Sequence, residues 1–90
     1  MLVQVSDRAE ADYLAIVEYL ANFSATTATS FIEDYERAQA SLREFPRIGM
    51  ARPQPHRRVL HFGRRYHLEY ELRQDRVILR RVKDGRRQAD

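Results

Sequence analysis

The stretch that decides the fold is Arg65–Val82, RYHLEYELRQDRVILRRV. Apolar and polar side chains alternate in its first half, and the apolar set is Tyr66, Leu68, Tyr70 and Leu72. This period of two predicts a strand over about 65–73 with a buried face and a wet face that carries His67, Glu69 and Glu71. Gln74-Asp75 then predicts a two-residue turn, and the β-branched run Val77–Val82 predicts a last strand in an interior position of the sheet.

Upstream of this hairpin the sequence continues the sheet. Arg57–Phe62 has the composition of a strand, and Gly63 marks the turn that joins it to the next one. Residues 46–56 contain all three prolines of the chain together with Gly49, so we expect a loop there. The short, β-rich segment Met1–Val5 predicts a first strand.

Two helices are predicted between the first strand and the loop. Ser6 is a good N-cap for a helix over about 7–21. Ser24 can cap a second helix, which should end near Phe45 because Pro46 disfavours helical geometry in the residue before it. The apolar stripe of the first helix is Ala9, Tyr13, Ile16, Val17 and Leu20. The stripe of the second is Phe31, Tyr35, Ala38, Leu42 and Phe45.

The order of these elements gives the fold class. One strand, two helices and three strands fill residues 1–90 as a single domain. The short break between the helices makes them an antiparallel hairpin, which should cover one face of a small, mainly antiparallel sheet. We therefore predict an α+β domain. Its core is too small to surround a deep cavity, so a function at a surface or in a shallow groove is expected.

Charge is divided unevenly along the chain. Residues 1–45 hold three basic and eight acidic side chains, a net charge of −5, whereas residues 46–90 hold thirteen basic and five acidic ones, a net charge of +8. Twelve of those thirteen are arginines, whose planar fork of donors suits carboxylates and phosphates. The C-terminal half therefore predicts a surface for a negatively charged partner; the alternative is a solvated surface that has none.

Several classes of protein and site are disfavoured. The chain has no cysteine, which excludes disulfides, thiolate zinc sites and a cysteine nucleophile. Neither a signal peptide nor an apolar run near the roughly 20 residues of a membrane span is present, so we expect a soluble, cytoplasmic protein that does not enter membranes. The glycines form no nucleotide-binding loop and no nucleophile elbow. No cofactor is expected.

The histidines and arginines of the sheet are the remaining candidates for chemistry. A hairpin that turns at Gly63 would bring His61 and His67 together, but a metal site needs further ligands, so no metal is predicted. Arg80 and Arg81 should point to opposite faces of the last strand. Whichever faces the helices needs a partner, because an unpaired buried charge is unfavourable. The candidate partners are the helix acids Glu18 and Glu44.

Four local motifs, in this order, resemble the RelE/ParE superfamily of bacterial toxins. The segment 9–19 (AEADYLAIVEY) is similar to the family's first helix, and 45–49 (FPRIG) to the Pro-x-x-Gly that ends its second. Arg57-Arg58, Gly63, Tyr66 and Tyr70 resemble its central strands. The segment 77–87 (VILRRVKDGRR) resembles the closing motif, in which a histidine usually stands at the position of Asp84. The matches extend through nearly the whole chain.

This resemblance implies two alternative activities. ParE-type members poison DNA gyrase by binding, and RelE-type members cut mRNA on the ribosome. If the chain is a ribonuclease, the residues expected around the phosphate are Arg58, His67, Arg81 and Arg86. Asp84 disfavours that mechanism because an acid repels phosphate, so the ParE branch, which is not an enzyme of this kind, is preferred. A toxin fold that has lost its activity is a third possibility.

The resemblance also implies a protein partner. Such toxins form a hetero-oligomer with a cognate acidic antitoxin, which folds onto them and neutralises them. We predict that the antitoxin binds Arg57, Arg58, Arg65 and Arg80. We predict that the residues for toxicity and target binding are Arg81, Lys83, Arg86 and Arg87. The tyrosines should pack in the core, because they fall on the apolar face of their strand.

Overall fold

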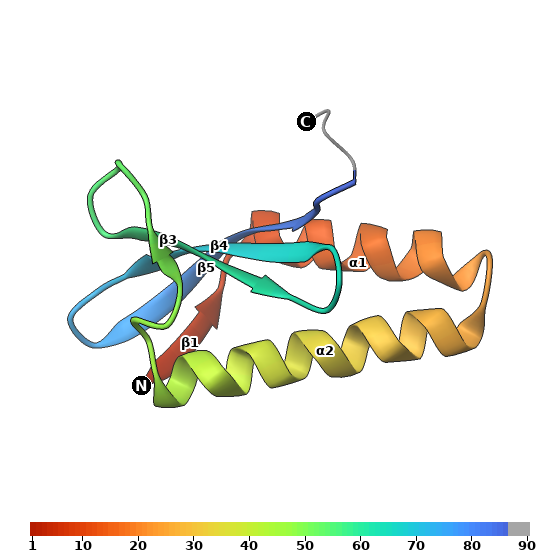
Figure 1. Cartoon of the computed structure of the whole chain (residues 1–90), viewed down its shortest axis with the longest axis horizontal. Helices are drawn as coiled ribbons and strands as arrows, with labels where there is room; N and C mark the ends of the chain where they lie inside the picture. Colours follow the sequence, from red (N-terminus) through yellow and green to blue (C-terminus); the bar gives the residue numbers. More distant parts are fainter. Residues whose placement is uncertain (87–90) are drawn as a thin grey trace.

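The computed structural model describes residues 1–86 and shows a helical hairpin packed against one face of a sheet (Figure 1). The α+β class and the order of elements are confirmed, with one additional short strand. The elements in chain order are β1 (Leu2–Val5), α1 (Asp7–Ala21), α2 (Ala25–Glu44), β2 (Met50–Ala51), β3 (Arg57–Phe62), β4 (Tyr66–Leu72) and β5 (Arg76–Asp84).

The strands of the sheet lie in the order β1-β5-β4-β3-β2. Only β1 and β5 are parallel, with Val5 opposite Leu79, so the sheet is mainly antiparallel as predicted. β5 is hydrogen-bonded on both sides, which confirms its interior position. β1 ends at Val5, and the C-terminal part of β5 therefore extends beyond its parallel neighbour.

The expectation that residues 46–56 form only a loop was wrong. Met50 and Ala51 form β2, an edge strand opposite Val59 and Arg58 of β3. Two residues are too short to show any hydrophobic period, and both are exposed. The strand exists because β3 offers a free edge of backbone donors and acceptors, which only the folded sheet provides.

The two helices have the predicted bounds. The Ser6 hydroxyl accepts a hydrogen bond from the Ala9 N–H at 3.1 Å, and Ser24 caps α2 through the Thr27 N–H at 3.2 Å. α2 ends at Glu44, immediately before the residue that Pro46 constrains. Phe45, expected in the buried stripe of α2, is 59% exposed, because its non-helical backbone (φ −132°, ψ 74°) takes it out of the helical period.

The core lies between the hairpin and the sheet and is rich in aromatic rings. Phe31 contacts the rings of Tyr13, Tyr35, Phe62 and Tyr66 at centroid distances of 4.7–6.2 Å. The tyrosines of β4 are therefore core residues, as predicted, and do not offer exposed rings for base stacking. None of the helices in the described part of the chain is long and apolar enough to cross a membrane.

Tyr70 ties the loop after α2 to the centre of the sheet. Its fully buried hydroxyl accepts a hydrogen bond from the Gly49 N–H at 2.9 Å and donates one to the Pro46 carbonyl at 2.8 Å. A Cβ at Gly49 would lie 2.6 Å from that hydroxyl, so only glycine allows this approach. The Pro-x-x-Gly motif thus fixes the path of the chain from α2 to β2.

This tether predicts a difference between two tyrosine variants. Tyr70→Phe leaves the Gly49 N–H and Pro46 carbonyl without their partner, so the free energy of unfolding should fall by about 1–3 kcal/mol. Tyr35 is the matched control, because its buried hydroxyl makes no hydrogen bond of normal geometry among the described residues and interacts only weakly with the side chain of Gln39. Tyr35→Phe should change stability by less than about 0.5 kcal/mol or increase it. Urea unfolding followed by circular dichroism measures both, and equal losses would contradict the tether.

Candidate binding surface of the sheet

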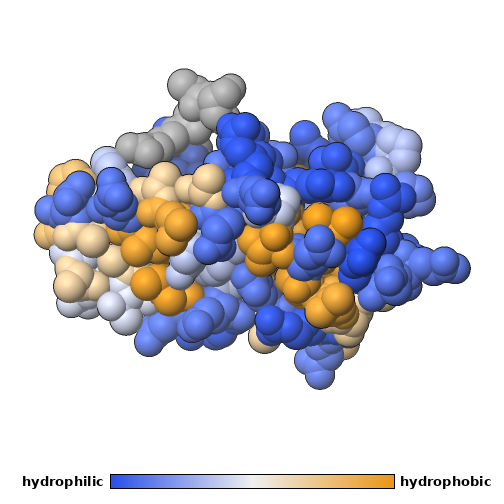
Figure 2. Space-filling model, turned by 180° about the vertical axis from the view of Figure 1, so that it is seen from behind, coloured by the Kyte–Doolittle hydropathy of each residue, from blue (hydrophilic) through white to orange (hydrophobic). Residues whose placement is uncertain are grey.

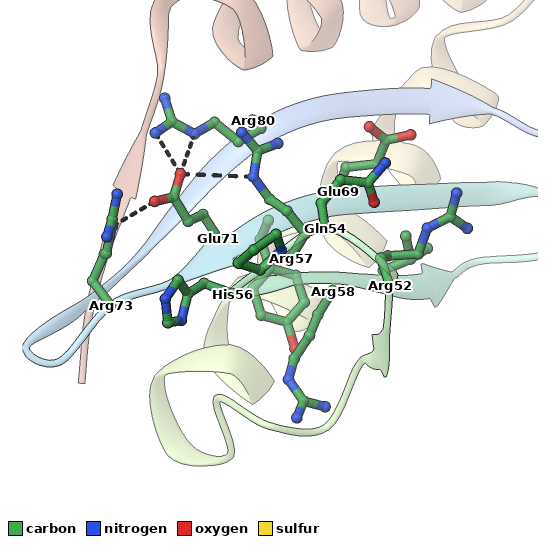
Figure 3. A pocket seen from close by; sticks show the side chains of 12 residues that line it. Arg52, Gln54, His56, Arg57, Arg58, Glu69, Glu71, Arg73 and Arg80 are labelled. Atoms are coloured by element: carbon green, nitrogen blue, oxygen red, sulfur yellow. Dashed lines mark hydrogen bonds and ion pairs between the residues drawn. The ribbon is translucent and has the colours of Figure 1, made fainter.

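The face of the sheet opposite the helices holds an open pocket of about 600 Å³ (Figure 3). β3 and β4 form its floor, and the loop between β2 and β3 forms one wall. Arg57 and Glu71 lie opposite each other in the β3–β4 register, so their side chains emerge on the same face. The pocket is shallow and polar, as expected for so small a domain.

A buried carboxylate stands at the centre of this surface. Glu71 is only 4% exposed and accepts hydrogen bonds from Arg80, whose Nε and Nη2 lie 3.0 and 2.6 Å from Oε1. The Nε of Arg57 lies 3.7 Å from the same oxygen, and Arg73 pairs with the other. The hydrogen bond from Arg80 is the main reason that the pKa of Glu71 lies below its ordinary value, despite its burial.

The predicted wet position of Glu71 was therefore wrong. The alternation of β4 places it on the face away from the helices, but three arginine side chains cover it there. Two of the four residues predicted to bind an antitoxin, Arg57 and Arg80, are thus members of one ion-pair cluster. We call the set of Glu71, Arg57, Arg73 and Arg80 the Glu71 cluster.

The side chain of Arg58 binds backbone carbonyls, whereas that of its neighbour Arg57 pairs with Glu71. The Nη1 of Arg58 donates hydrogen bonds to the carbonyls of Gly49 at 2.7 Å and Arg47 at 3.1 Å. Figure 3 shows its side chain leaving the sheet away from Glu71 and toward the loop after α2. Arg58 therefore holds the same loop that Tyr70 tethers.

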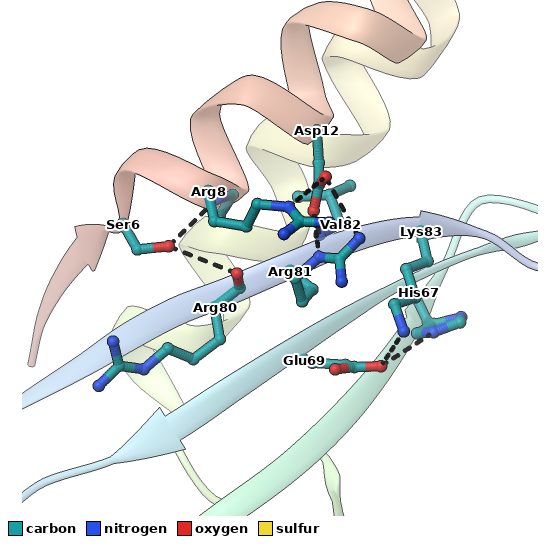
Figure 4. A network of polar contacts seen from close by, with 10 residues as sticks. Ser6, Arg8, Asp12, His67, Glu69, Arg80, Arg81, Val82 and Lys83 are labelled. Atoms are coloured by element: carbon teal, nitrogen blue, oxygen red, sulfur yellow. Dashed lines mark hydrogen bonds and ion pairs between the residues drawn. The ribbon is translucent and has the colours of Figure 1, made fainter. Parts of the chain in front are cut away.

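Arg80 and Arg81 diverge at a bulge in β5. The register with β4 shifts between Glu69 and Tyr70, so that Arg80 is an extra residue between Leu79 and Arg81. Arg80 reaches Glu71 on the uncovered face, whereas Arg81 reaches Asp12 of α1 with its Nε 2.7 Å from Oδ2 (Figure 4). The predicted ion pair with a helix acid therefore exists.

The partner predicted for that ion pair was wrong: it is Asp12 and neither Glu18 nor Glu44. Asp12 also accepts a hydrogen bond at 3.0 Å from the Val82 N–H, which lies beyond the end of β1. Asp12 thus takes the place of a strand partner where the parallel pairing stops. The exposed Arg8 lies 3.5 Å from its other oxygen.

The middle of the uncovered face carries a second set of paired charges. Lys83 Nζ lies 3.1 Å from Glu69 Oε2, and His67 Nε2 lies 3.7 Å from the same oxygen. Burial holds the pKa of His67 below its ordinary value. His61 lies opposite His67, with ring centroids 5.6 Å apart, as predicted from the turn at Gly63. Residues 1–86 contain no group of three or more His, Cys, Asp or Glu that could hold a metal ion.

We call the end of the sheet that holds the β3–β4 turn and the C-terminal end of β5 the far end of the sheet. Basic side chains are concentrated there, and two of them have no ion pair within the described chain. Arg65 lies 3.6 Å from Asp84, and its Nε donates to the Tyr66 hydroxyl at 3.2 Å. Among the described residues, no hydrogen bond or ion pair engages the guanidinium groups of the exposed Arg64 and Arg86. Both line a pocket of about 390 Å³ with His61 and His67. Arg87, predicted to belong to the same strip, lies outside the described residues.

Asp84 is not the unpaired acid expected from the sequence. Its side chain is 8% exposed, pairs with Arg65 and accepts a hydrogen bond at 3.0 Å from the Arg86 N–H. The acid is therefore neutralised within the fold and fixes the turn after β5. Its repulsion of a phosphate at this end is correspondingly weaker than the sequence implied.

The four residues proposed for RNA cleavage do not form one constellation. His67 and Arg86 line the same pocket at the far end. Arg58 lies opposite Tyr70, three residues from His67 along β4, which is about 10 Å and the opposite face. Arg81 is committed to Asp12. The arrangement brings two candidates together and separates the other two from them.

Three residues that matter here were not among the sequence candidates. Glu71 and Asp12 each accept hydrogen bonds from an arginine, and Arg52 lines the pocket near the Glu71 cluster with no hydrogen bond or ion pair to its guanidinium in the described chain. The sequence showed only that Glu71 is an acid within a predicted strand, two residues before Arg73. Arg52 gave no signal, because it lies in a loop whose path depends on Tyr70 and Arg58.

Comparisons with known proteins agree with this architecture. A family model described as "ParE toxin of type II toxin-antitoxin system, parDE" matches residues 3–89. A solved structure described as "Chromosomal ParDE TA system from P. aeruginosa" has a similar fold, with a TM-score of 0.76 and 20% sequence identity over 93% of this chain and 95% of that one. No curated protein matches the sequence significantly.

Proposed function

Because this chain belongs to the ParE toxin family and is the toxin component of a type II toxin–antitoxin system, we propose that it arrests growth by binding DNA gyrase in the cytoplasm and is neutralised by a cognate acidic antitoxin. The family match supports the class of protein. The choice of target and of contact surface rests on the resemblance to gyrase-binding members and on the distribution of charge over the sheet.

The observation that favours binding over RNA cleavage is the internal pairing of the basic residues. Arg58 holds backbone carbonyls, Arg81 is held by Asp12, and Lys83 contacts Glu69. A side chain that must stabilise a cleaving phosphodiester has to be aimed at it and not at a neighbouring carboxylate. Arg58 and Arg81, two of the four residues considered for RNA cleavage, are therefore engaged in contacts within the fold.

The surface that we assign to the target is the far end of the sheet. Arg64 and Arg86 are exposed there, and the neighbouring Arg65 is paired with Asp84. Lys83 and Arg81, which were also predicted for toxicity, pair with Glu69 and Asp12. Exposed guanidinium groups attract an acidic surface and speed its encounter. Arg86 and Arg87 belonged to the strip predicted for toxicity, and Arg64 extends that strip across the β3–β4 turn.

The double variant Arg64→Glu with Arg86→Glu tests this assignment. We expect growth arrest on induction to be lost, and inhibition of gyrase supercoiling by purified protein to weaken at least about tenfold, because two attractive charges become repulsive. The fold should persist, because neither guanidinium makes an ion pair in residues 1–86. Arg52→Glu, the same change at the other end of the sheet, is the control and should stay toxic. Full toxicity of the double variant would refute the assignment.

A second candidate function is ribosome-dependent mRNA cleavage. The observation in its favour is that His61, His67 and Arg86 line one pocket, where an imidazole with a lowered pKa could transfer a proton. Primer extension on cellular mRNA after induction separates the two functions. Cuts at fixed codon positions would support the nuclease, whereas an SOS response with stabilised gyrase–DNA breaks would support the gyrase poison.

A further inference from the structure

The turn between α1 and α2 presents an aromatic side chain to solvent. Phe23 is 72% exposed, the largest exposed fraction among the large hydrophobic side chains of residues 1–86. Its ring contacts that of Tyr19, which is 39% exposed, with the two centroids 5.0 Å apart. The Phe23 N–H donates to the Leu20 carbonyl at 3.0 Å, so the backbone of the turn is fixed. The ring is therefore held at the surface and takes no part in the core.

The surroundings of Phe23 carry no charge. Residues 19–32 (YLANFSATTATSFI) contain no Asp, Glu, Lys or Arg, although 32% of the chain is charged. The exposed side chains next to Phe23 along the chain are small and neutral: Ala21, Asn22, Ala25 and Thr26. A partner that covers such side chains removes little hydration and little conformational entropy. We call residues 19–27 the hairpin tip. The left end in Figure 2, where it lies, is paler and less hydrophilic than the right end.

The hairpin tip adjoins the far end of the sheet. α1 runs alongside β5 toward the same end of the molecule (Figure 1), and Asp12 of α1 accepts a hydrogen bond from the Val82 N–H. The helix rises about 10 Å from Asp12 to Tyr19, which is about the length of three strand residues beyond Val82. Tyr19 is therefore level with Gly85, and Phe23 lies beyond it at the end of the hairpin.

Arg65 supplies a second link between the two surfaces. Its hydrogen bond to the Tyr66 hydroxyl is the main reason that the pKa of Arg65 lies above its ordinary value, and Tyr19 contributes in the same direction. Tyr19 therefore lies near this guanidinium. The neighbouring Arg64 and Arg86 are exposed and line the pocket of about 390 Å³. An uncharged area with an exposed ring thus stands beside guanidinium groups that have no ion pair in the described chain.

We propose that the hairpin tip is the apolar anchor of the target-binding surface: Phe23 enters a hydrophobic pocket in an acidic protein surface, and Arg64 and Arg86 pair with carboxylates around that pocket. The inference rests on the proposed function and deepens it. The centre of a protein interface is depleted of charge and enriched in aromatic residues, and a few such anchors supply most of the affinity. The arginines select an acidic partner, and the ring slows its dissociation.

The hairpin tip favours a protein over a nucleic acid. A nucleic acid that continued from Arg86 onto the tip would meet no lysine or arginine over residues 19–32, so its phosphates would remain unpaired there. The exposed Glu18 stands at the start of this stretch and would repel them. An apolar pocket of a protein has no such charge to neutralise.

Phe23→Ser tests the anchor, and Phe45→Ser is the matched control, because Phe45 is also exposed and stands at the opposite end of α2. In biolayer interferometry with purified gyrase, Phe23→Ser should weaken binding about thirtyfold, mainly through faster dissociation. Phe45→Ser should change it less than about twofold. Phe23→Leu, which stays apolar, should retain most of the affinity. The urea midpoint of Phe23→Ser should equal that of the wild type, because the ring is outside the core.

The salt dependence of binding distinguishes the anchor from the charges. Raising the ionic strength should weaken the wild-type protein and Phe23→Ser by the same factor, because salt does not screen an apolar contact. The double variant Arg64→Glu with Arg86→Glu should instead lose most of this dependence together with its fast association. A salt dependence that changes in Phe23→Ser would contradict the apolar role of the ring.

Four further results would overturn the proposal. The first is wild-type affinity of Phe23→Ser for a target that the wild-type protein binds. The second is equal weakening by Phe45→Ser, which would indicate only a general loss of exposed apolar surface. The third is weaker binding of single-stranded DNA by Phe23→Ser, which would assign the ring to a base. The fourth is a changed sedimentation coefficient of Phe23→Ser alone, which would assign the tip to a second copy of the chain.

Growth arrest on induction separates this inference from the proposed function. If the wild-type protein does not bind gyrase, but Phe23→Ser abolishes growth arrest and Phe45→Ser does not, the proposed function falls and the anchor stands for another protein target. If the wild-type protein and Phe23→Ser inhibit gyrase equally, the anchor falls and the proposed function stands.

Discussion

Asp12→Ala is expected to lower the free energy of unfolding by about 3 kcal/mol, because it leaves a guanidinium and a backbone donor without their acceptor. The Asp12 carboxylate is 14% exposed and accepts hydrogen bonds from Arg81, which is 23% exposed, and from the Val82 N–H. Little water can replace those contacts. Urea unfolding followed by circular dichroism measures the loss.

Two further variants make this result specific. Asp12→Asn keeps an oxygen for the Val82 N–H but removes the charge, so it should lose less than Asp12→Ala. Glu18→Ala is the matched control, since Glu18 lies on the same helix and is exposed. It should change stability by about 0.5 kcal/mol or less. If Glu18→Ala and Asp12→Ala lose the same amount, the contact between α1 and β5 is not what stabilises the fold.

The contact with Asp12 also changes how a variant of Arg81 must be interpreted. Arg81→Glu would place two carboxylates where an ion pair now stands, and a loss of toxicity could then come from unfolding. For this reason Arg64 and Arg86, whose guanidinium groups have no hydrogen-bond or ion-pair partner in the described chain, are the informative positions for target binding.

Glu71→Gln is expected to lower the free energy of unfolding by about 2–3 kcal/mol near neutral pH. The variant keeps the volume of the side chain but removes the charge that three arginines share. The loss stays below that of a fully buried pair, because those arginines remain partly solvated. Glu69→Gln is the control, because Glu69 is 30% exposed and its pair with Lys83 should contribute about 0–1 kcal/mol.

The effect of Glu71 should depend on pH in a defined direction. The folded protein holds the pKa of Glu71 below its ordinary value, so the carboxylate stabilises the fold above the unfolded pKa of about 4.3 and loses that effect as pH falls through the folded value. The difference between wild type and Glu71→Gln should therefore be constant from about pH 7 to pH 5 and shrink below. A difference that grows on acidification would contradict the role of the ion pairs.

The local sequence was sufficient for most of the architecture. Caps, prolines and hydrophobic period predict the bounds of α1, the end of α2 shortly before Pro46, the strand Arg57–Phe62 and the turn at Gln74-Asp75. These signals act within a few residues, so no knowledge of the fold is needed to detect them. β2 escaped detection because its partner strand, and not its own two residues, makes it a strand.

The sequence also determined that the C-terminal half would be rich in arginine, but only the tertiary structure decided what each arginine does. A long side chain can reach several carboxylates, and its choice depends on backbone geometry far away in the sequence. The bulge opposite Glu69 and Tyr70 directs the Arg80 side chain toward Glu71. Because β1 ends at Val5, the edge of β5 beyond it has no strand partner, and Asp12 pairs with Arg81 there. Hydrophobic period has a range of one helical turn or one strand, whereas the ion pair between Arg81 and Asp12 spans 69 residues of sequence.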